Sequence, residues 1–493
     1  MTTVTTATTV TNPLLIDLYQ LTMAQGLWRS GRADDQASFA YNFRENPFEG
    51  GFAIFAGIEE FSHYLENWHF SDSEIEWLSN LHAHSGTKLF DKDFLAWLKG
   101  LEMDLDVHAA AEGSIVFAKE PLVRVTGSLI TCQLLEAALM NRINFETLIA
   151  TKAARCYLAA EGGQLFEFGL RRAQGPDGGI TASRAAYIGG CSATSNLEAA
   201  RKFGIPVAGT HAHSWVMAHE SEKEAFQAWT HSYSNYSVLL VDTYDSLKGI
   251  AEAVKAGSEL EARGGSFAGI RLDSGDLAWL SKRARVMLDE AGLTEAKIFV
   301  SNDLDEHVIF SLKAQGAPID SWGVGTRLAT GGDQSALGGV YKITALKRAG
   351  SAKWEPKIKV SDQAIKTSTP GILGLRRYFN EKGRPIGDMV YDLMDKPDAD
   401  GSSTIVDPYD LTRQKNFSAE AECVEMLQPF FEGGVRSAQT RDLAEIRESA
   451  LENLATLDKS HLRFMQPHRY PVGLERNLFE RQLEMIKEHK GLA

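Results

Sequence analysis

The sequence predicts an α/β protein built around an irregular, TIM-like α/β barrel, with a mixed α+β domain before it and a helical segment after it. Two observations predict this fold class. Through the middle of the chain, strand-like apolar segments alternate with amphipathic helices, which is typical of parallel strands joined by crossover helices. Polar or glycine residues follow almost every one of these strands, as they do at the ligand-binding end of α/β folds.

We expect four parts along the chain. Residues 1–11 form a Thr-rich, uncharged and disordered tail without the apolar core of a signal peptide. An N-terminal α+β domain covers residues 12–143, and the barrel with the active site covers residues 144–350. A C-terminal region, rich in loops and then helical, covers residues 351–493.

In the N-terminal part the residue pattern predicts a helix from Leu14 to Met23 and a strand from Ala37 to Tyr41. Asn46 to Gly51 is a turn. Apolar and polar residues alternate twice between Gly113 and Leu129, on both sides of Glu120-Pro121, which predicts a pair of antiparallel strands. Helices then fill residues 130–160.

The barrel strands are expected at six segments: Leu165–Leu170, Val207–Thr210, Val238–Val241, Ala268–Leu272, Ile298–Val300 and Trp322–Val324. The clearest crossover helix follows Asp276, carries one apolar stripe and stops at Gly292. After Tyr341 the alternation ends. Residues 357–386 and 395–400 are expected to be loops, and residues 440–490 helical with a break at Pro467 to Pro471.

Composition excludes several functions. The 493 residues carry a net charge of −14, with 44% apolar and 24% charged residues. Nucleic acids and anionic membranes need a basic partner surface, so neither is expected to bind. No apolar run reaches the roughly 18 residues of a membrane span. The four scattered cysteines indicate reduced, buried thiols in a cytoplasmic protein.

Two histidines follow the expected strand Val207–Thr210. An HxH pair on a strand points both rings to one face, which is metal-ligand spacing, so His211 and His213, with His219 as a third ligand, are consistent with a metal-dependent hydrolase. Histidine at a strand end can equally act as a nucleophile. A second His-Ala-His-Ser, at 82–85, has no strand before it and is expected to be structural surface.

The other strand ends suggest anion binding. Arg271 and Asp273 share one turn, and Arg171 and Arg172 follow the first strand. Arginine at such a place can grip a carboxylate or phosphate with two hydrogen bonds. Gly323-Val324-Gly325-Thr326 offers backbone N–H groups and a hydroxyl to a phosphate. Asp245, Asp276 and Asp305 are expected to be ordinary helix caps.

Together these segments resemble the nicotinate phosphoribosyltransferase family, in the family's own order along the chain. The resemblance covers nearly everything after the tail. It is carried by Asp17–Met23, Phe168–Gly175, Gly209–Ser214, Val241–Asp245, Arg271–Asp276, Gly323–Thr326 and the closing His468–Leu474.

The resemblance implies a type II phosphoribosyltransferase fold and an enzyme that joins nicotinate to phosphoribosyl pyrophosphate, coupled to ATP hydrolysis through a phosphohistidine at His213. It implies nicotinate near Tyr19, Thr210 and Arg271. The resemblance also implies that phosphate binds at Gly325 and Thr326 and that the assembly is a homodimer with shared active sites. Gly323 and Arg171 are further candidates for binding phosphoribosyl pyrophosphate.

The chemistry of these residues agrees with the implied reaction. Tyr19 can stack on the pyridine ring while Arg271 pairs with the carboxylate. Loss of pyrophosphate calls for Mg²⁺, bound chiefly by phosphates, and for cationic donors. Asp273 is the candidate to orient the metal or to offset the ribosyl cation.

One alternative is the same fold acting on nicotinamide. Relatives that use the amide carry an aspartate where we align Ser195. A serine hydroxyl can donate to a carboxylate, whereas an aspartate would repel it. Ser195 therefore favours the acid. A non-catalytic binding protein of this fold is disfavoured because no catalytic position is visibly degraded.

Overall fold

The computed structural model describes residues 12–363, 366–395 and 403–492. The expected tail at 1–11 and nearly all of the expected loop at 395–400 lie outside the described residues. The chain forms two compact units. Unit 1 takes residues 1–148 and 336–493, and unit 2 takes residues 149–335. This division into two units does not test the domain boundaries expected from the sequence, which stay predictions.

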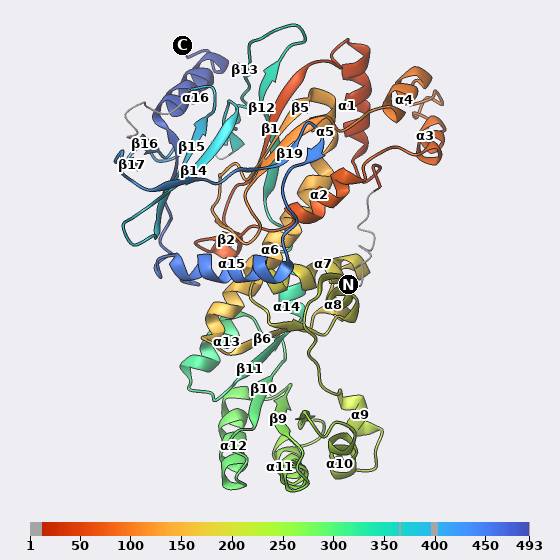
Figure 1. Cartoon of the computed structure of the whole chain (residues 1–493), viewed down its shortest axis with the longest axis vertical. Coiled ribbons are helices and arrows are strands. Elements are labelled where there is room, and N and C mark those ends of the chain that lie inside the picture. The colour runs from red at the N-terminus through yellow and green to blue at the C-terminus, as the bar shows by residue number, and fades with distance from the viewer. Residues whose placement is uncertain (1–11, 364–365, 396–402, 493) are drawn as a thin grey trace. The chain divides into compact units, whose positions relative to one another are not determined.

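Unit 2 is a six-stranded, all-parallel sheet with helices around it (Figure 1). In spatial order its strands are β7 (Ala193–Thr194), β6 (Gln164–Glu167), β11 (Ser321–Val324), β10 (Lys297–Val300), β9 (Phe267–Leu272) and β8 (Ser237–Leu240). Its helices are the end of α6 (Glu136–Ala160), η2 (Leu170–Arg172), α7 (Gly175–Ile188), α8 (Leu197–Phe203), α9 (His213–Met217), α10 (Glu222–Ser232), α11 (Ser246–Ala262), α12 (Leu277–Glu290), α13 (Glu306–Ala314) and α14 (Thr326–Ala329).

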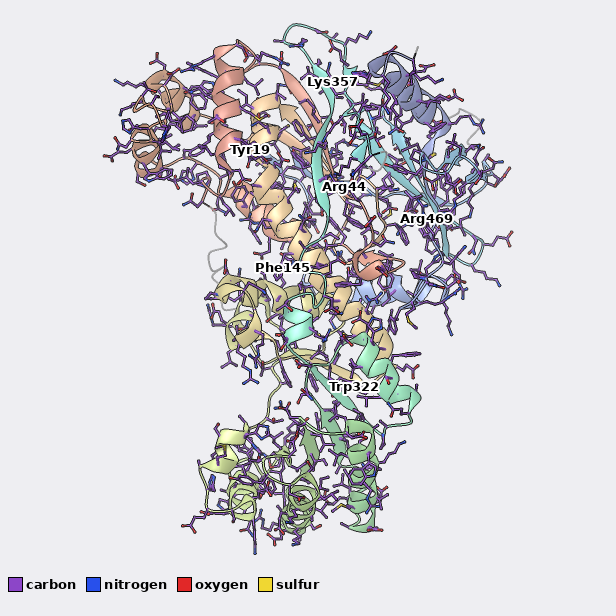
Figure 2. All side chains as sticks on the ribbon, turned by 180° about the vertical axis from the view of Figure 1, so that it is seen from behind. Tyr19, Arg44, Phe145, Trp322, Lys357 and Arg469 are labelled. Carbon is purple, nitrogen blue, oxygen red and sulfur yellow. The ribbon has the colours of Figure 1, made fainter. Side chains whose placement is uncertain are left out.

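Five of the six expected barrel strands are confirmed in this sheet. All residues of β8 and β11 are buried, which is why they read as continuous apolar runs rather than alternating ones. Trp322 of β11, labelled in Figure 2, is fully buried. Gly269 allows close pairing of β9 with β10, because a Cβ there would overlap the Lys297 carbonyl oxygen.

The sixth expected strand, Val207–Thr210, is wrong. Val207 makes one isolated parallel bridge to Thr194 and is 60% exposed. The sequence around it explains the failure. Gly204 ends α8 in the left-handed conformation, and Pro206 has no N–H group for a ladder. The edge position belongs instead to the two-residue strand β7, which is too short to leave a periodic signal.

The predicted helix starts in unit 2 are confirmed. The side chains of Asp245, Asp276 and Asp305 each accept backbone N–H groups in the first turn of α11, α12 and α13, at 2.9–3.0 Å. The stripe of α12 is buried as expected, and Gly292 follows it with φ 79°. These caps fix where each helix begins after a strand, and so where the strand-end loops lie.

Unit 1 joins N-terminal and C-terminal strands in one seven-stranded sheet. In spatial order the strands are β13 (Glu355–Pro356), β12 (Gly339–Lys347), β1 (Gln36–Phe43), β5 (Val123–Ser128), β3 (Leu105–Ala109), β19 (Gln428–Glu432) and β20 (Val435–Arg436). Beside it lie η1 (Pro47–Glu49), the start of α6, and helices α1 (Leu18–Arg29), α2 (Ile58–Glu66), α3 (Asp72–Ser79), α4 (Lys92–Lys99) and α5 (Leu129–Leu134). The expected helix at 14–23 begins at Leu18, the strand at 37–41 is confirmed, and His82 and Ser85 are exposed as expected.

The expected antiparallel pair within residues 113–129 is wrong in its pairing. Both strands exist, but β4 (Ile115–Val116) pairs with β2 (Ala53–Ile54), whereas β5 pairs with β1 and β3. The connection between them is not a tight hairpin. The Glu120 carboxylate accepts the Phe117 N–H, and Lys119 has φ 73°, so the chain swings from one sheet to the other.

The loop expected at 357–386 and the purely helical C-terminal segment are also corrected. Unit 1 contains a second, six-stranded sheet in the spatial order β17 (Gln414–Phe417), β16 (Ser403–Val406), β21 (Val472–Glu475), β15 (Pro385–Asp392), β14 (Leu373–Phe379) and β18 (Cys423–Glu425). The expected helices are α15 (Leu443–Thr456) and α16 (Arg476–His489). The strand β14 was hidden by Arg376 and Arg377. Arg377 is buried nonetheless, because it pairs with Asp388 of β15 at 2.6 Å.

Two smaller findings concern the cysteines and membranes. Cys132, Cys156 and Cys191 are buried as expected, but Cys423 is exposed. Among the described residues, no helix is long and apolar enough to cross a membrane.

Candidate active site

The centre of the candidate site is Arg271, at the end of β9 in unit 2. Its guanidinium donates from Nε to Ser301 Oγ at 2.8 Å, from Nη1 to Thr210 Oγ1 at 3.0 Å and from Nη2 to Asp273 Oδ1 at 3.0 Å. The ring of Phe168 lies 5.7 Å from the guanidinium carbon. Arg271 therefore ties together the ends of two neighbouring strands and the segment after α8.

Asp273 joins this cluster to His213. Its Oδ1 accepts from Arg271 and from the Ser301 hydroxyl, and its Oδ2 lies 3.6 Å from His213 Nε2. The other ring nitrogen of His213 lies 3.2 Å from Thr243 Oγ1. His213 opens the short helix α9 and its side chain is 40% exposed. The structure thus brings Arg271, Asp273, Thr210 and His213 together, as the sequence predicted.

Asp242, which follows β8, holds the Asp273 turn in place. Its Oδ2 accepts from the Asp273 N–H at 2.7 Å and from the Ser274 hydroxyl at 2.7 Å. Its Oδ1 is buried and has no hydrogen-bond partner among the described residues. An unpaired buried carboxylate oxygen is costly unless a cation or water completes it. A hard cation such as Mg²⁺ therefore fits the oxygens that Asp242 and Asp273 offer.

His211 has a different environment from His213. It is 5% exposed, its Nε2 accepts the Leu240 N–H at 3.2 Å, and its ring packs 4.8 Å from that of Trp229. Burial lowers its pKa to about 4, so the ring is neutral near pH 7. Because Nε2 is an acceptor, Nδ1 carries the proton and faces the Ala212 carbonyl. His211 is therefore a structural residue that anchors its loop to β8.

The three histidines of the metal-ligand hypothesis, His211, His213 and His219, do not form the ligand set of one metal ion. His219 Nδ1 contacts the Trp215 carbonyl at 2.8 Å, and His211 Nε2 is engaged by Leu240. No group of three or more His, Cys, Asp or Glu side chains in the described part of the chain has metal-binding geometry. A Mg²⁺ ion held mainly by substrate phosphates needs only one or two protein carboxylates.

Ser195 stands exposed at the end of β7, beside a buried network. Its backbone N–H donates to the Glu167 carbonyl at 3.0 Å. The Glu167 carboxylate accepts from the hydroxyls of Ser183 at 2.8 Å and Thr194 at 2.6 Å and from the Gly169 N–H. This network fixes the ends of β6 and β7 against each other, and so holds the position of Ser195.

The two glycines of the segment Gly323–Thr326, which runs from β11 into α14, have different surroundings. A Cβ on Gly323 would lie 2.7 Å from the Phe168 ring, so this glycine makes room for that ring. Gly325 precedes α14 and is half-buried together with Thr326. Arg171 lies in the 3₁₀ turn η2 and is exposed. Gly323, Gly325, Thr326 and Arg171 stay predictions as phosphate ligands.

Tyr19 belongs to unit 1, where it lies on α1 (Figure 2). Its hydroxyl donates to Glu136 Oε2 at 3.0 Å, and partial burial together with Glu136 raises its pKa to about 12. It borders an open hollow of about 450 Å³ that Leu14, Ile16 and Met140 also line. Its contact with nicotinate stays a prediction.

Sequence reasoning missed Ser301 and Asp242 as members of the cluster. Ser301 directly follows β10, and Asp242 follows β8 after one further residue; this position was the available signal. The backbone after Ser301 adds another, which only the structure gives: Asn302 has φ 102° and Asp303 φ 25°. Non-glycine residues in this region are uncommon and gather at functional sites.

Sequence reasoning also missed a small cleft in unit 1, adjoining β1 and β12. Its lining is strongly basic: Arg44, Lys119, Lys342, Lys359 and Lys366. Arg44 is labelled in Figure 2. These cations come from separate stretches of the sequence, so no local motif indicates that they line one cleft.

Comparison with known proteins adds family information. Three family models match: the nicotinate phosphoribosyltransferase N-terminal domain over residues 14–144, the nicotinate phosphoribosyltransferase family over residues 164–384, and the nicotinate phosphoribosyltransferase C-terminal domain over residues 374–482.

Full-length relatives agree with these family models. The nicotinate phosphoribosyltransferase of Bacillus subtilis (strain 168) is 41% identical, over 96% of this chain and 95% of its own length. That of Dictyostelium discoideum is 35% identical, over 95% and 87%. The crystal structure of human nicotinic acid phosphoribosyltransferase is similar with a TM-score of 0.81 at 30% identity, covering 95% of this chain and 99% of that one.

Proposed function

The chain belongs to the nicotinate phosphoribosyltransferase family, and on this premise we propose that it transfers the phosphoribosyl group of phosphoribosyl pyrophosphate to nicotinate. The products are nicotinate mononucleotide and pyrophosphate, and the step belongs to NAD salvage. ATP hydrolysis to ADP and phosphate drives the reaction. The observation that carries the proposal is the contact of Arg271, Asp273, Thr210 and His213 in one cluster.

Arg271 can bind the nicotinate carboxylate without leaving its present partners. A guanidinium has five N–H donors, and the contacts to Ser301, Thr210 and Asp273 use one from each nitrogen. The remaining donors, one on each Nη, form the fork that a carboxylate accepts. Thr210 Oγ1 and, on the far side of the pyridine ring, Tyr19 complete the proposed nicotinate pocket.

Asp273 offsets the positive charge that develops on the ribose carbon as pyrophosphate leaves. Its two oxygens are held by Arg271 and Ser301 on one side and by His213 on the other, so the carboxylate is oriented before substrate arrives. When bound at Asp273 and Asp242, Mg²⁺ supplies charge neutralisation for the leaving pyrophosphate. Arg171, Gly323, Gly325 and Thr326 bind the phosphates of phosphoribosyl pyrophosphate.

His213 is the residue that takes phosphate from ATP. Its ring is partly exposed, and each nitrogen has a polar neighbour, Thr243 on one side and Asp273 on the other. One nitrogen can therefore keep its proton in a fixed tautomer while the other presents a lone pair to the γ-phosphorus. The new N–P bond forms as the bond to ADP breaks, and water later releases phosphate. The proximity of His213 to Asp273 would couple the phosphorylation state to the charge at the transfer site.

Ser195 supports nicotinate rather than nicotinamide as the substrate. A hydroxyl can donate to the carboxylate, and the strand end that carries it is fixed by the Glu167 network. The metal-dependent hydrolase is not favoured, because the ring nitrogen that His211 would offer already accepts a backbone N–H group.

Several broader expectations belong to the same proposal. The parallel sheet of unit 2, with the Thr194–Val207 bridge beyond its edge strand, supports an irregular α/β barrel. A homodimer would let Tyr19 of one subunit complete the site of the other. The net charge of −14 supports small anionic substrates met by local cations, and not nucleic acid or an anionic membrane surface. We place the enzyme in the cytoplasm.

The test is a turnover assay with nicotinate and nicotinamide in parallel, each with and without ATP and with phosphoribosyl pyrophosphate and Mg²⁺ present. The proposal expects nicotinate mononucleotide to form fastest with nicotinate and ATP together. Equal or faster turnover of nicotinamide would assign the chain to the amide. A rate of product formation that does not change when ATP is added would contradict the proposed coupling to ATP hydrolysis.

A further inference from the structure

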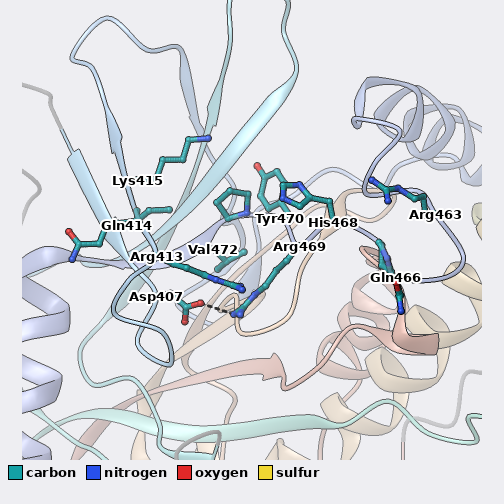
Figure 3. A pocket seen from close by; sticks show the side chains of 13 residues that line it. Asp407, Arg413, Gln414, Lys415, Arg463, Gln466, His468, Arg469, Tyr470 and Val472 are labelled. Carbon is teal, nitrogen blue, oxygen red and sulfur yellow. Dashed lines mark ion pairs between the residues drawn. The ribbon is translucent and has the colours of Figure 1, made fainter.

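Unit 1 contains a basic cavity of about 690 Å³, whose lining includes none of the residues assigned above. It lies between strands β16 and β17 and the segment that leads into β21, and Figure 3 shows its lining. The residues that matter here are Asp407, Arg413, Lys415, Arg463, His468 and Arg469. A cavity of this size is in the range of small-molecule sites.

The cavity gathers cations on a protein that is acidic overall. Figure 3 shows the guanidinium groups of Arg413 and Arg469 directed toward each other from different segments. Each has one carboxylate neighbour: Arg469 meets Asp407 at 2.9 Å, and Arg413 meets Asp410 at 3.0 Å. Both arginine side chains remain about half exposed, at 51% and 55%. Two half-exposed arginines in the lining of one cavity offer guanidinium N–H groups that a bound anion can accept.

Further cations extend the positive surface. Arg463 and His468 are exposed and line the same cavity, and Lys415 donates to the Ile386 carbonyl at 2.7 Å. Lys119 lies in the adjoining cleft that Arg469 also lines. Burial, with the charge of Arg469 next, lowers the pKa of Lys119 to about 8. The cations of this region therefore act on one another. Nearby carboxylates, Asp407 and Glu45 for Lys119 and Asp410 for Arg413, offset part of their charge.

The wall that carries these residues is rigid. Tyr470 is buried, donates to Asp388 Oδ1 at 2.9 Å and stacks on Phe117 with ring centroids 3.8 Å apart. The His468 carbonyl lies 2.6 Å from His461 Nδ1, and His461 is itself buried. The side chains of His468 and Arg469 are thus presented from an anchored backbone, so binding would cost little ordering entropy.

We propose that this cavity binds a small phosphorylated ligand that carries a di- or triphosphate group. The phosphate chain lies between Arg413 and Arg469 with Arg463 on its other side, because guanidinium groups bind phosphate oxygens in pairs. The volume exceeds what a bare triphosphate fills and leaves room for an organic part beside His468. The cavity shares no residue with the cluster at Arg271, so the proposal does not depend on the reaction assigned to that cluster.

The experiment is hydrogen–deuterium exchange of the full-length protein with added ATP or inorganic tripolyphosphate, against sodium chloride at equal ionic strength. We expect protection in peptides that cover residues 405–417 and 459–473. Protection by both compounds supports the proposal with the phosphate chain as the recognised part, and protection by ATP alone supports it with the organic part required. Protection of neither segment by either compound overturns it.

Variants identify the cations. Arg413→Gln and Arg463→Gln, alone and together, should each weaken the concentration dependence of this protection about tenfold, because each removes a charged hydrogen-bond donor. The matched control is Arg201→Gln, another exposed arginine that pairs with a carboxylate three residues before it. Arg463→Gln alone serves if the double variant fails to fold. The slow nicotinate turnover measured with phosphoribosyl pyrophosphate, but without ATP or tripolyphosphate, should be unchanged in all of them. Protection that survives in the double variant contradicts the proposal.

Discussion

Replacing Arg271 tests the organisation of the candidate site at its centre. Arg271→Ala removes three hydrogen bonds from a charged guanidinium: one to the Asp273 carboxylate and two to the hydroxyls of Ser301 and Thr210. At about 2 kcal/mol for each charge-assisted bond, the local loss is about 6 kcal/mol. Since the Arg271 and Asp273 side chains are 18% and 28% exposed, water will recover part of it.

The functional loss adds to the structural one. If Arg271 pairs with the nicotinate carboxylate, its removal should cost about 2–5 kcal/mol of nicotinate binding, which is a rise in KM of at least about 30-fold. Arg271→Lys should recover little, because a single ammonium cannot replace a guanidinium that contacts Ser301, Thr210 and Asp273 together with the nicotinate carboxylate. Ser301→Ala removes one contact of Arg271 and one of Asp273, so it should give an intermediate effect.

Steady-state kinetics with varied nicotinate at saturating ATP and phosphoribosyl pyrophosphate measure this series. Arg283→Ala is the control, because Arg283 is exposed on α12 and lies outside the cluster. Thermal unfolding of each variant separates loss of folding from loss of binding. An unchanged KM for nicotinate in folded Arg271→Ala would refute the assigned role, whatever happens to kcat.

Two further predictions concern specificity and pH. Ser195→Asp should shift the ratio of kcat/KM from nicotinate toward nicotinamide by about tenfold or more, because an added carboxylate repels the acid and accepts a hydrogen bond from the amide. Assays with the two substrates in parallel measure this ratio. A ratio equal to that of the wild type would show that Ser195 does not line the nicotinate pocket. Burial lowers the pKa of His211 from 6.5 to about 4. Between these two pH values the ring is protonated in the unfolded chain but neutral in the folded protein. The free energy of unfolding therefore falls by up to about 3 kcal/mol as the pH drops through this window. In His211→Gln the amide oxygen can still accept the Leu240 N–H but does not titrate, so its deficit in thermal midpoint at pH 7.5 should shrink at pH 4.5, while a deficit that is constant with pH argues against a buried neutral ring.

The parallel strands of unit 2 were predictable because burial on both faces leaves a plain apolar run. The same reasoning found the caps Asp245, Asp276 and Asp305, whose signal is local. It failed at Val207–Thr210, where apolar letters suggested a strand but Pro206 and Gly204 prevent a ladder. It failed again at β14, because the charged residue Arg377 interrupts the apolar pattern of the strand. Arg377 is buried through its ion pair with Asp388, its cross-strand partner on β15.

The candidate site divides in the same way. Arg271 and Asp273 could be picked out because they stand at the end of β9, and His213 because it lies in the Gly209–Ser214 segment that carries the family resemblance. The difference between His211 and His213 could not be derived from spacing alone, since it depends on Leu240 and Trp229, which close around one ring and leave the other exposed. The basic cavity at Arg413 and Arg469 is assembled from separate segments, and no stretch of sequence contains it.

The central claim is that His213, and not His211, takes phosphate from ATP. The most direct measurement is transfer of label from γ-³²P-ATP to wild-type protein, His213→Asn and His211→Gln, read as acid-labile phosphate on the chain. We predict label on wild type and on His211→Gln and none on His213→Asn, which should keep slow ribosyl transfer that no longer responds to ATP. Acid-labile label retained on His213→Asn, or lost from a folded His211→Gln, would contradict the account.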